Sequence, residues 1–207
     1  MPGSRRTRPR VLALYGSPRK KGHSARIHDA FLAPLAAVAS VKRVRVQGLN
    51  VSPCTACGHC RGGLSCVFDD DMSALYEEIE RARLISISAP VYFSGLPGAL
   101  KCVIDRFQVL WEARERGEKR PVPGEGFFIS VSGAEYRNVF LPSVTTIRHF
   151  FNSLGIAYRE KNFLLFPAVE EKWKGQLPGE WLTRASAAGE RYARALLSDT
   201  PGSAPSS

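Results

Sequence analysis

Long apolar runs are missing from this sequence of 207 residues. No stretch approaches the about 20 apolar residues that a membrane-spanning helix needs, so contact with a membrane is not expected. The apolar run at residues 11–15 is too short for the hydrophobic region of a signal peptide, and Gly16 and Pro18 follow it closely. We therefore expect a cytoplasmic protein.

Several nucleotide-binding and catalytic signatures are also absent. Neither the dinucleotide fingerprint G-x-G-x-x-G nor the P-loop G-x-x-x-x-G-K-[ST] occurs in the sequence. The four histidines lack the spacing of metal ligands, and no serine–histidine–acid arrangement or paired-carboxylate site stands out. Hydrolytic chemistry that depends on such side chains is therefore not expected, and no residue is assigned a catalytic role.

Acidic residues are scarcer than basic ones. The chain has 29 Lys and Arg against 19 Asp and Glu, which gives a formal net charge of +10. Four of the arginines lie in or beside an amino-terminal arm without acidic residues: Arg5, Arg6, Arg8 and Arg10. Nucleic acid is not expected as a partner, because no basic stripe with interleaved aromatic residues accompanies this charge. A polyanionic cofactor would account for the positive balance equally well.

Apolar periodicity predicts one α/β domain over residues 10–197, preceded by a flexible basic arm at 1–9 and followed by a disordered tail at 198–207. Strands alternate with helices, and this alternation favours a single parallel sheet with helices on both faces. The second strand carries Lys and Arg on one side, which is typical of an edge strand. Strands are predicted at 11–15, 41–49, 84–89, 127–131 and 156–166, and helices at 24–39, from 72 onward, at 97–111, 143–154 and 179–197.

Residues 11–26, VLALYGSPRKKGHSAR, carry a local signal for phosphate binding. A buried strand is followed by a loop of small and basic residues and then by a helix, for which Ser24 is the predicted N-cap. Free backbone N–H groups at a helix start attract anions, and Ser17, Arg19 and Ser24 add side-chain donors. The alternative is an ordinary strand-to-helix turn with a solvated basic tip.

Two more loops, 90–97 and 132–138, leave the same edge of the predicted sheet. In open parallel sheets, ligands bind beyond the carboxyl ends of the strands. Small residues in these loops let a ligand approach the backbone, and Tyr92 and Phe93 offer flat faces to an aromatic ring. A ligand with a phosphate at one end and a fused ring at the other fits this arrangement, and FMN has that form.

The chain resembles the flavodoxin-like NAD(P)H-dependent FMN reductases and, within them, the iron–sulfur flavoproteins. The resemblance rests on residues 16–25, the cysteine run with its trailing DDDM at 69–72, residues 89–107 and residues 130–136. It implies a five-stranded parallel sheet of order 2-1-3-4-5. The FMN-binding residues that it implies are Ser17, Arg19, Gly22, His23 and Ser24 around the phosphate, Pro90, Val91, Tyr92 and Phe93 along the ribityl chain and ring, and Ser132 and Gly133 at the ring.

Two details of the resemblance concern His23 and three charged residues in the 89–107 segment. His23 stands where relatives often have asparagine, so a solvated loop histidine is the alternative to a phosphate contact. Lys101, Asp105 and Arg106 also match the family pattern, and we interpret them as scaffold or subunit-contact residues. The acidic run 69–71 precedes a predicted helix, where carboxylates favour the positive end of the helix dipole.

Four of the five cysteines lie within thirteen residues of the loop 50–70, as Cys54-x2-Cys57-x2-Cys60-x5-Cys66. A tetracysteine zinc site usually has a dozen or more residues between its two C-x-x-C pairs, so this compact run suits a 4Fe–4S cluster better. It resembles the cluster motif of the iron–sulfur flavoproteins. Free thiols and a zinc site remain the alternatives. Cys102, alone on an apolar helix stripe, is predicted to be a core residue.

These observations predict an FMN-dependent oxidoreductase that passes electrons to a quinone, a free flavin, a nitro compound or an iron–sulfur partner. The donor is NAD(P)H or a ferredoxin-like carrier, which a basic chain would attract. The alternatives are an FMN-only reductase without a cluster and a zinc-stabilised, non-enzymatic binding module. The wide apolar stripe over residues 100–111 predicts a homodimer or homotetramer.

Overall fold

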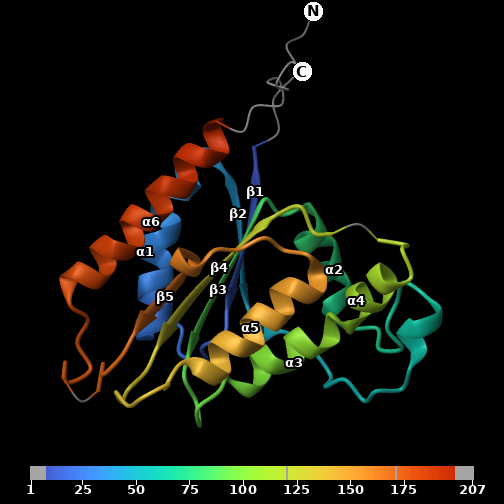
Figure 1. Cartoon of the computed structure of the whole chain (residues 1–207), viewed down its shortest axis with the longest axis horizontal. Helices are drawn as coiled ribbons and strands as arrows, with labels where there is room; N and C mark the ends of the chain where they lie inside the picture. Colours follow the sequence, from blue (N-terminus) through green and yellow to red (C-terminus); the bar gives the residue numbers. More distant parts are fainter. Residues whose placement is uncertain (1–7, 120, 171, 199–207) are drawn as a thin grey trace, which may run out of the picture.

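Five parallel strands form one sheet, in the order β2-β1-β3-β4-β5 (Figure 1). This order confirms the predicted flavodoxin-like α/β fold. The computed structural model describes residues 8–119, 121–170 and 172–198, so most of the predicted arm and tail lie outside the described residues. The strands are β1 (Arg10–Tyr15), β2 (Ser40–Arg45), β3 (Leu84–Pro90), β4 (Glu125–Val131) and β5 (Phe163–Phe166).

The strands follow from their residue types. The central strands β1, β3 and β4 are buried along almost their whole length, as strands covered on both faces must be. The edge strand β2 keeps Lys42 and Arg43 exposed, which confirms its predicted position. It ends at Arg45, earlier than predicted, because the chain then turns through a short 3-10 segment, η1 (Val46–Gly48).

Helices cover both faces of the sheet (Figure 1). Two of them, α1 (His23–Val38) and α6 (Gly179–Ser198), lie together on one face. Gly189 lies where they meet, and a Cβ there would stand 2.0 Å from the carbonyl oxygen of Phe31. The other face carries α2 (Met72–Arg81), α3 (Gly98–Arg106), α4 (Gln108–Glu115) and α5 (Leu141–Leu154). Each face buries its own hydrophobic cluster.

The structure corrects three details of the predicted helices. The first helix begins at His23 with Gly22 as its N-cap, so Ser24 is not the cap. The helix predicted at 97–111 is two helices, because the N–H of Phe107 bonds to the carbonyl of Ile104 in a tighter turn. Its second part, α4, runs into the predicted surface connection. Cys102 is partly exposed on α3, since it lies beside the buried stripe and not within it.

Two short 3-10 segments complete the description: η2 (His59–Gly62), inside the cysteine-rich loop, and η3 (Glu160–Asn162), just before β5. Among the described residues, no helix is both long enough and apolar enough to cross a membrane.

The loops after β1, β3, β4 and β5 all leave the lower edge of the sheet as drawn, whereas the cysteine-rich loop lies to the side, next to α4 (Figure 1).

Candidate functional site

A cavity of about 440 Å³ lies at the carboxyl ends of the strands. Nine of the eleven predicted cofactor-binding residues line this cavity, which therefore brings the loops after β1, β3 and β4 together. The loop after β5 also contributes. The lining residues are Ser17, Arg19, Lys21, Gly22, His23, Ser24, Pro90, Val91, Tyr92, Val131, Gly133, Val169 and Glu170.

The loop after β1 is hydrogen-bonded to β3, and it leaves hydrogen-bond donors available to a ligand in the cavity. The N–H of Gly16 donates to the carbonyl of Ser88 on β3 at 2.7 Å, so the loop is tied to the neighbouring strand. The hydroxyl oxygen of Ser17 accepts the N–H of Arg19 at 3.2 Å, which leaves the hydroxyl proton available to a ligand. Helix α1 has no side-chain cap and no acidic residue in its first turn. Its first N–H groups are therefore available to an anion.

Phe93 and Ser132 do not line the cavity. Tyr92 and Gly95 exchange two backbone hydrogen bonds of 2.9 Å, which makes residues 92–95 a tight turn. Phe93 occupies the turn tip with φ of 45° and is fully exposed, because the turn points its ring outward. Ser132 is buried, and its N–H donates to the carbonyl of Phe166. It therefore joins the ends of β4 and β5.

Sequence reasoning missed Val169 and Glu170 of this cavity. They follow β5, whose carboxyl end lies at the same edge of the sheet as those of β1, β3 and β4. The parallel strand order was the available signal, because it places every such loop at one edge. Glu170 adds a carboxylate where the loops after β4 and β5 meet, and its N–H donates to the carbonyl of Gly133 at 3.1 Å.

Sequence reasoning also missed His28. Its imidazole lies between α1 and the sheet, with Nδ1 2.9 Å from the Ser88 hydroxyl and Nε2 2.8 Å from the Ser86 hydroxyl. Burial, reinforced by the charges of Arg43 and Arg45, lowers the pKa of His28 to about 3. The ring is therefore neutral at physiological pH and fixes the strand whose Ser88 carbonyl holds the loop after β1.

All four cysteines of the loop 50–70 line a second cavity, of about 310 Å³. The opposite wall comes from α3 and α4, and it includes Arg106, Val109 and Glu112. Burial and the nearby Glu112 carboxylate raise the pKa of the Cys60 thiol. Among the described residues, no three His, Cys, Asp or Glu side chains stand close enough together to hold a metal ion. The thiols therefore share a cavity without converging on one point.

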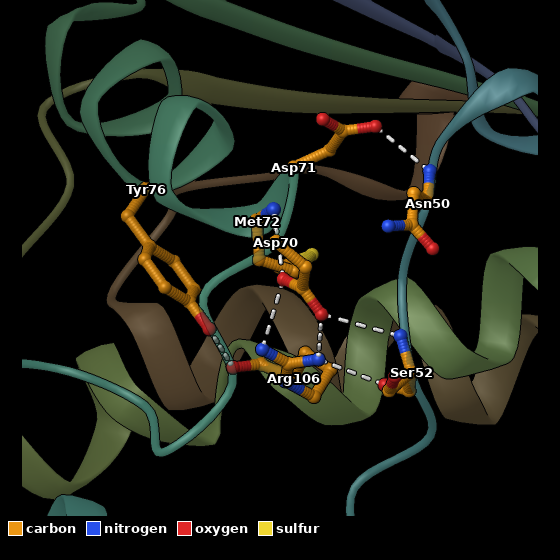
Figure 2. A network of polar contacts seen from close by, with 7 residues as sticks. All are labelled: Asn50, Ser52, Asp70, Asp71, Met72, Tyr76 and Arg106. Carbon is orange, nitrogen blue, oxygen red and sulfur yellow. Dashed lines mark hydrogen bonds and ion pairs between the residues drawn. The ribbon is translucent and has the colours of Figure 1, made fainter.

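The two ends of the cysteine-rich loop are joined by a buried ion pair (Figure 2). Arg106 on α3 donates to both carboxylate oxygens of Asp70, at 2.6 and 3.1 Å, and the two side chains are 1% and 5% exposed. The same guanidinium donates to the carbonyl of Ser52 at 2.8 Å, and the N–H of Ser52 donates to Asp70 at 3.2 Å. Residues 52 and 70 are thus held to α3 and to each other.

Neighbouring groups complete this network (Figure 2). Asp71 accepts the N–H of Asn50 at 2.7 Å, and Asp70 accepts that of Met72 at the start of α2. The hydroxyl of Tyr76 donates to the carbonyl of Arg106 at 2.9 Å. The acidic run therefore does more than favour a helix start, because its carboxylates close the loop. Arg106 is therefore a scaffold residue, which is one of the two roles predicted for it.

A model of the NADPH-dependent FMN reductase family matches residues 9–165. The chain belongs to this family. It is 35% identical over 130 residues to an iron–sulfur flavoprotein of Methanosarcina thermophila, a match that covers 60% of this chain and 64% of that relative. A match to an iron–sulfur flavoprotein of Archaeoglobus fulgidus, at 32% identity, covers 47% of this chain and 44% of the relative. The chain thus spans less than two thirds of the length of these relatives.

Solved structures show the same fold at lower identity. An FMN-dependent NADH-azoreductase from Bacillus anthracis superposes with a TM-score of 0.66 at 18% identity, over 91% of this chain and 99% of that one. An NAD(P)H:quinone oxidoreductase from Methanothermobacter marburgensis superposes with a TM-score of 0.64 at 16% identity, over 90% and 98%. At this identity the likeness concerns the fold alone.

The first cavity suits FMN, the cofactor in the name of the family. The uncapped start of α1 and the hydroxyl of Ser17 provide donors for a phosphate, and the cationic side chains of Arg19 and Lys21 balance its charge. A Cβ at Gly22 would stand 3.1 Å from the Cβ of Arg19 and 3.4 Å from the Ser17 hydroxyl, so a larger residue would crowd the loop.

The second cavity holds a donor set that suits iron or zinc. Four thiols line it, and none of the five cysteines forms a disulfide. Thiolates are preferred ligands of both zinc and iron–sulfur clusters. Because the described thiols do not converge, the loop between residues 52 and 70 would have to tighten around a bound metal.

The ion pair should make the stability of the protein sensitive to loss of Arg106. Replacing Arg106 with methionine leaves the Asp70 carboxylate buried without its partner, and we expect a loss of about 3–5 kcal/mol in the free energy of unfolding. Urea denaturation at pH 7 measures this loss. The matched control is Arg81→Met, which removes an exposed i,i+4 pair with Glu77 and should change stability by about 0.5 kcal/mol or less. Equal effects of the two substitutions would contradict the assignment.

The same pair predicts a pH dependence. Burial by itself would raise the pKa of the Asp70 carboxyl, but hydrogen bonds from Arg106, Met72 and Ser52 outweigh it and lower the pKa below its ordinary value. A depressed pKa in the folded state stabilises the protein above about pH 4, the range of the unfolded carboxyl. This stabilisation is lost as the pH falls through the folded pKa, and Arg106→Met should remove most of that dependence.

Proposed function

We propose that this chain is an FMN-dependent oxidoreductase that takes electrons from NAD(P)H. The observation that carries the proposal is the 440 Å³ cavity, where the uncapped start of α1 meets the loops after β3, β4 and β5. Membership of the NADPH-dependent FMN reductase family supports it. Bound FMN would supply the redox chemistry, and the protein would supply binding and orientation.

The residues of the chain have distinct tasks in this proposal. Ser17, Ser24 and the first N–H groups of α1 hold the phosphate, and Arg19 balances its charge. Pro90, Val91 and Tyr92 lie along the ribityl chain and the ring, and Gly133 leaves room for the ring edge. Phe93 and Ser132, which lie outside the cavity, have no contact with the cofactor in this arrangement.

Cofactor identity tests this function. Heat should release FMN and not FAD, because the cavity offers one phosphate site and the chain has no adenylate fingerprint. NADPH or NADH added without oxygen should bleach the flavin absorbance. Replacing Ser17 with alanine removes a nearly buried donor, and FMN affinity should fall by roughly 1–3 kcal/mol.

The control for this substitution is Ser94→Ala. Ser94 lies on the exposed turn after β3 and pairs with the Tyr136 hydroxyl at 2.9 Å, outside the cavity. Its loss should leave FMN affinity unchanged. Fluorescence titration of the flavin-free protein with FMN measures both variants. Recovery of FAD, or equal affinities of Ser17→Ala and the wild type, would contradict the proposed site.

We further propose that Cys54, Cys57, Cys60 and Cys66 hold a 4Fe–4S cluster. The support is their common cavity, the compact spacing and the iron–sulfur flavoproteins among the relatives. Such a cluster would let the protein exchange single electrons with an acidic, ferredoxin-like carrier, which its net charge of +10 would attract. A quinone, a free flavin or a nitro compound is the proposed acceptor where no such carrier takes part.

The cysteines should act as a unit. Changing any of the four to serine should abolish most of the iron and sulfide while flavin content survives, because a four-ligand site is coupled to the folding of its loop. Cys102→Ser is the control, since Cys102 lies outside the cavity. Iron and sulfide analysis after anaerobic reconstitution measures the outcome. Absence of iron in the wild type would leave an FMN-only reductase, and bound zinc would point to a structural site.

A homo-oligomer is also proposed. Most of the stripe over residues 100–111 is core, but Ile104 and Trp111 stay partly exposed and line a groove of about 430 Å³ between α5 and the pair α3 and α4. An apolar groove floor of this kind suits a second subunit. Sedimentation at micromolar concentration should give at least a dimer. A species of 22.8 kDa alone would contradict this proposal.

A further inference from the structure

Helix α4, which forms part of the wall of the cysteine cavity, is followed by an arginine that no sequence motif identified. Arg116 lies at the carboxyl end of α4, directly after Glu115. Its Nη1 donates to the carbonyls of Cys60 and Arg61 at 2.8 and 3.0 Å, and its Nη2 donates to the carbonyl of Gly63 at 2.9 Å. One guanidinium therefore holds three carbonyls of the turn that separates Cys60 from Cys66.

This contact differs from the closure at the base of the loop. Arg106 and Asp70 fix residues 52 and 70, whereas Arg116 reaches the middle of the loop from another helix. A further ion pair between Arg61 and Glu112, at 3.7 Å, also reaches the middle of the loop. The Arg61 side chain is 78% exposed, so this pair contributes little.

The chemistry of arginine suits this task. Its planar guanidinium presents five donors in a fixed fork, so it can hold several carbonyls at once, whereas the lysine ammonium is a compact point charge on a flexible stem. Glu118 bonds to Nη2 at 2.7 Å and orients the fork. The positive charge also stands next to a segment whose cysteines would bind a metal as thiolates.

We propose that Arg116 is a positioning residue of the cysteine site: it holds the turn at residues 60–63 against α4 while the rest of the loop tightens around the cluster, and its charge raises the reduction potential of that cluster. This inference rests on the proposed cluster. Arg116 does not line the cavity, so it acts through the backbone of the turn and through its electrostatic field. Groups that orient metal ligands commonly change metal affinity by roughly 10–100-fold.

The test compares Arg116→Met, Arg116→Lys and the matched control Arg114→Met in the full chain with FMN bound. Arg114 lies on the same helix but donates to the carbonyls of Asn152 and Ser153 on α5, away from the cysteines. After anaerobic reconstitution, Arg116→Met should lose iron to a chelator roughly 10-fold faster than the wild type. Its cluster should also have a lower potential, because a nearby positive charge is gone.

Arg116→Lys separates the two roles. It keeps the charge, so the potential should stay close to that of the wild type, while iron should still be lost faster because the fork is gone. Arg114→Met should match the wild type in both measurements. Flavin content verifies that each variant is folded. Iron loss from Arg116→Met at the rate of Arg114→Met, or an unchanged potential in Arg116→Met, would overturn the proposal.

A third measurement separates this inference from the cluster itself. In chelator-treated protein that retains FMN, alkylation of Cys60 by iodoacetamide should be several times faster in Arg116→Met than in the wild type, because the turn is released. If the wild type takes up no iron, the cluster proposal is wrong, and the alkylation rates alone decide whether Arg116 positions the turn. Equal rates in that case would overturn the role of Arg116.

Discussion

The buried ion pair between Asp70 and Arg106 organises the part of this protein that differs most from a plain sheet with helices. Two charges removed from water are tolerated only when their attraction and added hydrogen bonds offset the lost hydration. Here the carboxylate also accepts the N–H groups of Ser52 and Met72, and the guanidinium also donates to the carbonyl of Ser52. A loop without a buried apolar side chain among its described residues is thereby fixed to a core helix.

The break between α3 and α4 gives this loop two supports. Arg106 ends α3 and Arg116 follows α4, and the tight turn at Phe107 separates the two helices. Because the helices are distinct, one arginine closes the base of the loop while the other holds its middle. A four-thiol site built on such a loop depends on contacts to the scaffold more than on regular structure of its own.

The cavity at the strand ends depends on the sheet and not on a buried ion pair. A parallel sheet buried on both faces leaves only the loops at its strand ends for binding, and four of these loops meet at one edge. The neutral His28, held by Ser86 and Ser88, fixes β3 beneath the loop after β1 without placing a charge in the core. The scaffold is therefore rigid where the proposed phosphate site requires it.

The sequence by itself determined the alternation of strands with helices, the loop of small and basic residues after β1 and the cysteine spacing, because each depends on residues close together in the chain. Apolar periodicity and local turn chemistry predicted five strands, and loop composition predicted nine residues that line one cavity. The proposed FMN contacts and cluster ligands rest on the same local patterns together with the family resemblance.

Tertiary structure alone decided which distant residues meet. Asp70 and Arg106 pair across the fold, and no local pattern distinguishes that carboxylate from Asp71 beside it. Nothing in the local sequence distinguishes His28 from other polar residues on a helix, and only the packing of α1 on the sheet places it against two strand serines. Phe93 was predicted to line the cofactor, but the two-residue turn directs it outward. The burial and the direction of a side chain depend on contacts across the whole fold, whereas a sequence pattern reports only on residues that are close together in the chain.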